Sequence, residues 1–169
     1  MNQLKHVISL VLLVILLQGC KVSYSFTGAD IGNAQSFQVN NFINNAPIVE
    51  PSVARNLTLE LQDLILNQTS LGLVTNGGDL VYEGEIVQYY VSPITATSQS
   101  TAAQNRLTVA VNVRFFNTLE PEKDFEERFS FYFDYPGSSQ LIGSQLTDAL
   151  DVIYERLTQD IFNKSLANW

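Results

Sequence analysis

Alternation of apolar and polar residues over two long segments constrains the fold of this chain more than any other feature. Residues 106–116 (RLTVAVNVRFF) and 125–135 (FEERFSFYFDY) place large apolar side chains at most alternate positions. Successive side chains of a strand point to opposite faces of a sheet, so each segment predicts a strand with one buried face. The buried residues are expected to be Leu107, Val109, Val111, Val113 and Phe115 in the first and Phe125, Phe129, Phe131 and Phe133 in the second. The short link through 117–121 favours an antiparallel pair.

Two further strands are expected. Residues 36–42 alternate less regularly, and residues 79–90 are rich in Tyr, Val and Ile, which favour strands. Gly84 within the second of these indicates a bulge or a close approach of another chain segment. Residues 92–104 are small, polar and aperiodic, so we expect a mobile loop between strands there.

Apolar residues three and four positions apart predict two amphipathic helices, at about 52–67 and about 139–163. Ser138 or Ser139 is suited to cap the second helix. Strands in the middle of the chain with helices on either side of them in sequence indicate an α+β fold. We expect a two-layer sandwich of about four mainly antiparallel strands with two amphipathic helices on one face.

The only cysteine of the chain lies at the end of an apolar run near the N-terminus. Lys5 precedes the run 7–17, which is shorter than the roughly 20 residues that a helix needs to cross a hydrocarbon core. The run ends in Leu17-Gln18-Gly19-Cys20, the pattern of a bacterial lipobox, in which the thiol is lipidated and the chain is cut before it. A plain signal peptide with an incidental cysteine is the alternative. The lipobox interpretation predicts a lipid-anchored protein outside the cytoplasm.

This interpretation sets the expected domain boundaries. Residues 1–19 are a cleaved lipoprotein signal peptide, and residues 20–35 are the lipidated cysteine and a tether. Residues 36–169 are long enough for a single α+β domain with its own core.

Charge and residue inventory exclude several classes of function. The chain has 9 basic and 17 acidic residues, a net charge of −8, and its signal segment holds Lys5 and no acid. Nucleic acid is therefore a poor partner. His6, the only histidine, leaves with the signal peptide. Ser-His-Asp and Cys-His catalysis and a zinc site with nitrogen or sulfur ligands are then excluded in the mature chain, and we expect no enzyme, cofactor or metal.

The candidate contact residues lie on the predicted sheet. Arg106 and Arg114 share one strand face; they pair with acids across the sheet, such as Glu83 and Glu85, or they meet an anionic lipid or sugar phosphate. Glu83 and Glu85 are suited to acid–base hydrolysis in principle, but a solvated sheet face is the favoured interpretation. The amphipathic side chains of Tyr82 and Tyr132 suit contact with a ligand or partner, and they suit the interior or the edges of the sheet equally well.

The ordered set of segments resembles a known family. The lipobox is followed by YSFTGADI, FINNAPIVEPSVARNLTLELQDLILNQTSLGLV, NRLTVAVNVRF, PEKDFEERFSFYFDY and the terminal DIFNKSLANW. Together they are similar to the lipopolysaccharide-assembly lipoprotein (LptE) family of the Gram-negative outer membrane. The resemblance implies a two-helix, four-stranded lipoprotein in the inner leaflet of that membrane, which acts as a non-enzymatic plug inside a large β-barrel translocon. Such a protein supports barrel assembly and the transport of lipopolysaccharide to the cell surface.

The resemblance leaves two functional hypotheses. The first is a plug and assembly partner of a large outer-membrane β-barrel, compatible with the polar lumen of such barrels. Members that bind lipopolysaccharide use basic side chains on the sheet, whereas only Arg106 and Arg114 supply positive charge on the strand at 106–116. Direct contact with lipopolysaccharide is therefore an open part of this hypothesis. The alternative is a free, periplasm-facing lipoprotein that binds a lipid or glycan between the sheet and the loop at 92–104.

Overall fold

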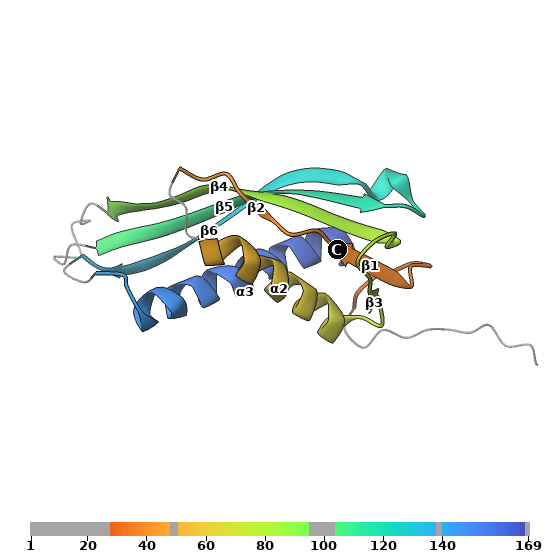
Figure 1. The fold of residues 1–169 in the computed structure, drawn as a ribbon, viewed down its shortest axis with the longest axis horizontal. Coiled ribbons are helices and arrows are strands. Elements are labelled where there is room, and N and C mark those ends of the chain that lie inside the picture. Colours follow the sequence, from red (N-terminus) through yellow and green to blue (C-terminus); the bar gives the residue numbers. More distant parts are fainter. Residues whose placement is uncertain (1–27, 48–50, 95–103, 138–139, 168–169) are drawn as a thin grey trace, which may run out of the picture.

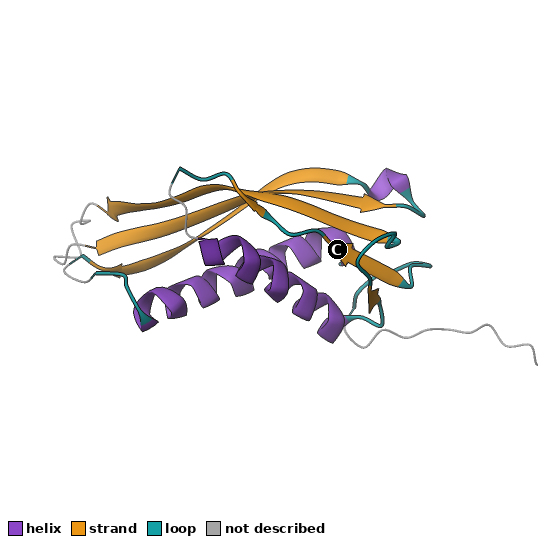
Figure 2. Cartoon of the chain, in the orientation of Figure 1, coloured by secondary structure: helices purple, strands orange, loops and turns teal. Residues whose placement is uncertain are grey.

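The computed structural model describes residues 28–47, 51–94, 104–137 and 140–167. Along the chain, these form β1 (Ser36–Val39), β2 (Ile43–Asn44), α2 (Pro51–Gln68), β3 (Gly72–Leu73), β4 (Leu80–Ile94), β5 (Gln104–Asn117), the 3-10 turn η1 (Pro121–Lys123), β6 (Phe125–Pro136) and α3 (Ser144–Leu166). The two helices lie side by side in one layer below a twisted sheet (Figures 1 and 2). The predicted α+β two-layer class is confirmed. Within the described residues, no helix is long and apolar enough to cross a membrane.

The sheet has more strands than the sequence predicted. Its order is β3-β1-β4-β5-β6, and β2 also pairs with β4 beyond the end of β1. β4, β5 and β6 form the expected antiparallel meander, whereas β1, β2 and β3 are short strands in parallel pairing. The predicted single strand at 36–42 is thus replaced by β1 and β2. Two-residue strands such as β2 and β3 are too short to show alternation, so the estimate of four was wrong in number.

The predicted buried faces meet in one core. On β5, Leu107, Val109, Val111, Val113 and Phe115 are at most 1% exposed. On α2, Val53, Leu57, Leu61 and Ile65 are fully buried, and on α3 so are Ile153, Leu157 and Ile161. The helical and strand periodicities were therefore assigned to the correct faces.

Gly84 marks the close approach that the sequence indicated. A Cβ built on Gly84 would lie 2.7 Å from Cε2 of Phe42, so the Phe42 ring packs directly on the β4 backbone. The bulge of β4 lies further along, between Ile86 and Gln88, where the pairing with β5 shifts by one residue. The chain leading into β2 is held to β4 by this aromatic contact.

Two boundaries differ from the prediction. β4 extends to Ile94 and β5 begins at Gln104, so the ends of the expected loop at 92–104 belong to strands; residues 95–103 lie outside the described part. Helix α3 begins at Ser144 rather than near Ser139, because Gly143 precedes it with a left-handed φ of 59°. The expected caps, Ser138 and Ser139, also lie outside the described residues.

The start of the described chain is packed on the domain. Ala29 forms a β-bridge with Ala167, and Asp30 N donates a hydrogen bond of 2.6 Å to Leu166 O. Ala29 and Ala34 are both buried. The described part of the expected tether therefore lies against the C-terminal end of α3.

Candidate functional site: the exposed face of the sheet

The face of the sheet opposite the helices carries most of the candidate contact residues. Side chains of paired residues in an antiparallel ladder point to the same face, so the register groups them into rows across β4, β5 and β6. Five rows carry polar or aromatic groups: Ser92–Arg106–Asp134, Tyr90–Thr108–Tyr132, Gln88–Ala110–Ser130, Glu85–Asn112–Arg128 and Glu83–Arg114–Glu126. The candidate site is this exposed sheet face.

Arg106 lies at one end of the exposed sheet face and is held on two sides. Its Nε and Nη2 donate to Oδ1 and Oδ2 of Asp134 at 2.7 and 2.8 Å, and its Cζ lies 3.5 Å from the centroid of the Tyr132 ring. The hydrogen bonds with Asp134 raise the pKa of Arg106, and they lower the pKa of the Asp134 carboxyl. The positive charge of Arg106 is therefore balanced by Asp134, and its guanidinium group is stacked on the Tyr132 ring.

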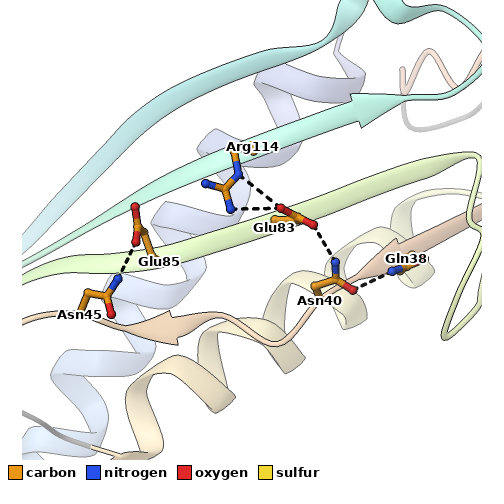
Figure 3. A network of polar contacts seen from close by, with 6 residues as sticks. All are labelled: Gln38, Asn40, Asn45, Glu83, Glu85 and Arg114. Atoms are coloured by element: carbon orange, nitrogen blue, oxygen red, sulfur yellow. Dashed lines mark hydrogen bonds and ion pairs between the residues drawn. The ribbon is translucent and has the colours of Figure 1, made fainter.

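Arg114 occupies the other end of the face and joins a polar network (Figure 3). Its Nη2 lies 3.1 Å from Oε2 of Glu83, while Oε1 of Glu83 accepts a hydrogen bond of 3.1 Å from Asn40 Nδ2. Asn40 Oδ1 in turn accepts from Gln38 Nε2 at 2.7 Å. The network connects β5, β4 and the end of β1, and its charges are paired within it.

Glu85 is held separately. Asn45 Nδ2 donates to Oε2 of Glu85 at 2.6 Å (Figure 3). Glu83 and Glu85 thus belong to two different hydrogen-bonded groups on the exposed sheet face. This arrangement supports the interpretation of the two carboxylates as a solvated sheet face rather than an acid–base pair.

The candidate residues separate into exposed and buried positions. Arg106, Arg114 and Tyr132 lie together on the exposed sheet face, where Tyr132 is 45% exposed. Tyr82 is fully buried on the opposite face, with its ring centroid 4.9 Å from that of Phe115 and its hydroxyl 2.9 Å from Ser165 Oγ. Of the two positions that the sequence left open for Tyr82, contact with a ligand or partner and the interior of the sheet, the structure shows the interior, and burial raises the pKa of Tyr82. Cys20 lies outside the described residues.

The pairing interpretation of the two arginines is confirmed, since each bonds an acid across the sheet. Sequence reasoning did not single out Asp134, Asn40 or Asn45. Asp134 was on the correct face by alternation, but only the register of β5 and β6 places it opposite Arg106. Asn40 and Asn45 carried no sequence signal, because they belong to the irregular chain around β2.

Chemically, the exposed sheet face presents paired charges, amides and two half-exposed tyrosines, Tyr90 and Tyr132. A phosphate group would compete with Asp134 and Glu83 for the two paired guanidinium groups. The face is better suited to a polar, uncharged or alternately charged surface than to a dense array of phosphates.

Comparison with known proteins gives one family. The sequence profile of the LptE family, described as lipopolysaccharide-assembly, matches residues 34–165. The search of curated proteins gave no match.

Several solved structures are similar to this one at low sequence identity. A hypothetical protein of Chlamydia trachomatis is 13% identical with a TM-score of 0.49, covering 80% of this chain and 99% of that chain. A minor lipoprotein of Acinetobacter baumannii is 10% identical with a TM-score of 0.47, covering 79% and 97%. An uncharacterized lipoprotein B of Nitrosomonas europaea is 12% identical with a TM-score of 0.49, covering 86% and 88%.

Proposed function

Because the chain belongs to the LptE family of lipopolysaccharide-assembly proteins, we propose that it is the lipoprotein subunit of an outer-membrane β-barrel lipopolysaccharide translocon. In this role it is anchored through Cys20 in the inner leaflet of the outer membrane, acts as a plug and assembly partner of the barrel, and performs no catalysis. The family match over residues 34–165 carries the proposal, since it spans both helices and the sheet almost completely.

The exposed sheet face is the proposed contact with the barrel. Barrel lumens are polar, and a surface whose charges are already paired loses less when a second polar surface covers it than a surface with unpaired charges does. Arg106 is paired with Asp134 and Arg114 with Glu83, so neither cation has to find a new partner on docking. Tyr90 and Tyr132 supply half-exposed rings of the kind enriched in protein interfaces.

Contact with lipopolysaccharide is proposed to be secondary to the barrel contact. The two arginines on β5 are engaged by carboxylates, so their exchange toward phosphate oxygens would leave Asp134 and Glu83 unpaired. A plug that supports the barrel requires no such exchange.

The first test is a mild-detergent pull-down of C-terminally tagged protein from outer membranes, followed by mass spectrometry. A stoichiometric large β-barrel is the expected result. A lone lipoprotein, with or without bound lipid, would contradict the proposal and favour a free lipid- or glycan-binding module.

The interface is tested in the same experiment by Arg114→Glu, which places a third acid beside Glu83 and Glu126. Recovery of the barrel should fall. The matched control is Arg55→Glu, the same charge change at an exposed position of α2 in the other layer. Equal recovery with Arg114→Glu and wild type would show that the barrel is contacted by another surface.

A further inference from the structure

The outer edge of β6 is a long strand edge that the described part of the molecule leaves open. β6 ends the strand order and pairs with β5 on one side, and it runs for 12 residues. The strand at the opposite end of the order, β3, has 2 residues. Long open edges expose backbone N–H and C=O groups that pair readily with a further strand.

The hydrogen-bonding side of each β6 residue follows from the ladder. Tyr82 O accepts a hydrogen bond of 2.9 Å from Asn40 N, so the backbone N–H and C=O groups of Tyr82 point toward the short strands. Those of its neighbour Glu83 therefore point the other way, toward β5. The backbone groups of Arg114, the partner of Glu83, therefore point back toward β4, and those of the residues beside Arg114 point toward β6. The β6 partners of these residues have odd numbers, so the odd-numbered residues of β6 direct their backbone groups toward β5. The even-numbered residues, Glu126, Arg128, Ser130, Tyr132 and Asp134, thus present their N–H and C=O groups to the open edge.

Helix α3 packs along β6 (Figure 1). Three hollows are lined by side chains of β6 and of α3 or its flanking residues. The middle hollow has a volume of about 270 Å³ and is lined by Phe131, Val152, Glu155, Arg156 and Gln159. A second, of about 250 Å³, is lined by Phe133, Tyr135 and Leu141 among others, and a third, of about 370 Å³, includes Phe125 and Lys164. Each is bordered by inward side chains of β6. An added strand would therefore find hydrogen-bond partners at its backbone and space beside these rings.

We propose that a second copy of this chain occupies the edge, with the two β6 strands antiparallel about a two-fold axis at Phe131. This register places Arg128 of each copy opposite Asp134 of the other, which gives two equivalent pairs. Arg128 is exposed and has no ion-pair partner among the described residues. A register centred on Ser130 would instead place Glu126 opposite Asp134, and like charges directly opposite are destabilising. Asp134 is already paired with Arg106 in its own copy, so the added attraction is small, but the Phe131 register avoids the like-charge contact of the Ser130 register and is favoured among long overlaps.

The same register is favourable on the helix side. Phe131 is an odd-numbered residue, so the two copies of it form a non-hydrogen-bonded pair, the kind in which opposed side chains lie closest. Val152, 43% exposed, lines the hollow beside Phe131. The Phe131 ring is stacked on that of Tyr132, with centroids 5.6 Å apart, and Arg156 lies 5.8 Å from it, so these groups would have to move for a second phenyl ring to enter the hollow and cover Val152. The dimer is a property of the chain apart from its barrel and does not rest on the proposed function.

Sedimentation equilibrium of the mature protein in a density-matched detergent tests the inference. The wild type should be a reversible dimer. Arg128→Glu converts two attractive pairs into two repulsive ones and should raise the dissociation constant by about tenfold or more. Arg55→Glu, with the same charge change on α2, should leave it unchanged. A wild-type protein that is monomeric at every concentration would overturn the proposal. A dimer that Arg128→Glu does not weaken would overturn it as well, because two chains that share a micelle through their lipid anchors would behave in this way.

A cross-linking experiment tests the register. Ser130 and Tyr132 of the two copies form a hydrogen-bonded pair in the proposed dimer, with Cα atoms about 5.5 Å apart, within the range of a disulfide. Mixing Ser130→Cys with Tyr132→Cys under mild oxidation should give a cross-linked heterodimer. Mixing Ser130→Cys with Glu126→Cys should not, and the parent chain measures any contribution of Cys20. Equal cross-linking in both mixtures would contradict the register.

Discussion

Asp79 joins the beginning of β4 to the beginning of β1. Its Oδ2 accepts hydrogen bonds from Gln35 N at 2.9 Å, from Ser36 N at 3.0 Å and from Ser36 Oγ at 2.9 Å. The backbone hydrogen bond from Gln35, followed by that from the Ser36 hydroxyl, lowers the pKa of Asp79 below its ordinary 3.8. A single carboxylate thus holds two strand ends whose sequence separation is large.

The pH dependence of stability follows from this lowered pKa. A carboxylate with a lower pKa in the folded state stabilises the fold above its unfolded pKa, and the contribution is lost as the pH falls through the folded pKa. Asp79→Asn should therefore reduce the free energy of unfolding near neutral pH, and the gap to wild type should shrink below about pH 4. Urea unfolding at several pH values measures this. Asp63→Asn, an exposed acid of α2, is the control; a gap independent of pH would contradict the assignment.

Gly84 provides a second prediction at the residue scale. A methyl group there would lie 2.7 to 2.9 Å from three carbons of the Phe42 ring, which is itself 5% exposed. Because the ring has little room to move, Gly84→Ala should destabilise the protein by about 1–3 kcal/mol, the usual effect of overpacking. Chemical denaturation checks it against Gly72→Ala, where the nearest atom to the new Cβ is at an ordinary 3.7 Å. Equal effects of the two substitutions would show that the Phe42 ring can yield.

At the scale of the element, α2 has one face in the core and one in solvent. Leu57 is fully buried, whereas Leu59, two positions later, is 45% exposed. Leu57→Ala removes buried methyl groups and leaves a cavity, so the free energy of unfolding should fall by about 2–5 kcal/mol. Leu59→Ala, the same substitution on the other face, should change it by less than about 0.5 kcal/mol. Thermal and urea unfolding compare the two; similar losses would mean that the exposed face of α2 is covered in solution.

The strands differ in how strongly their sequences specify them. β5 alternates in sequence and is paired on both sides, and its apolar face is buried as the pattern predicts, although Thr108 and Ala110 on the other face are buried as well. β1 and β2 depend on β4 for their conformation, with Asn40 N and Asn45 N donating to Tyr82 O and Ile86 O. Their local sequences alternate poorly, and the contacts that make them strands come from residues about 40 positions away.

At the scale of the whole molecule, the proposed lipidation of Cys20 would connect the domain to the membrane. Cys20→Ser should abolish incorporation of a labelled fatty acid, because the acceptor thiol is lost, and should leave the folded core intact. Metabolic labelling followed by immunoprecipitation measures incorporation, and Ser23→Ala, which keeps the thiol, is the control. Undiminished labelling of Cys20→Ser would contradict lipidation at this position.

The described N-terminal end also bears on how the molecule is attached. Asp30 is fixed to the C-terminal end of α3 by its hydrogen bond to Leu166, and Lys123 Nζ lies 3.6 Å from its carboxylate. The chain therefore enters the domain beside η1 and the end of α3. If Cys20 is the anchor, this end of the domain lies no more than about 35 Å from the membrane surface, the reach of the intervening residues at full extension.

The sequence by itself determined the α+β class, the extents of the three long strands to within a few residues, and the buried faces of β5, α2 and α3. These features are set by local periodicity, which depends only on the order of apolar residues along one element. It also determined that Arg106 and Arg114 share a face with acids, since alternation fixes the face of every side chain on a strand.

Only the tertiary structure decided which residues meet. The register pairs Arg106 with Asp134 and Arg114 with Glu83, and a shift of one residue would have sent each side chain to the other face. Alternation groups Tyr82 with Leu80 and Ile86, opposite Glu83 and Glu85, and the packing of the helices against that face decided that Tyr82 is buried. The short strands and the open edge of β6 likewise depend on pairing between distant segments. Periodicity within one element carries no information about such pairing.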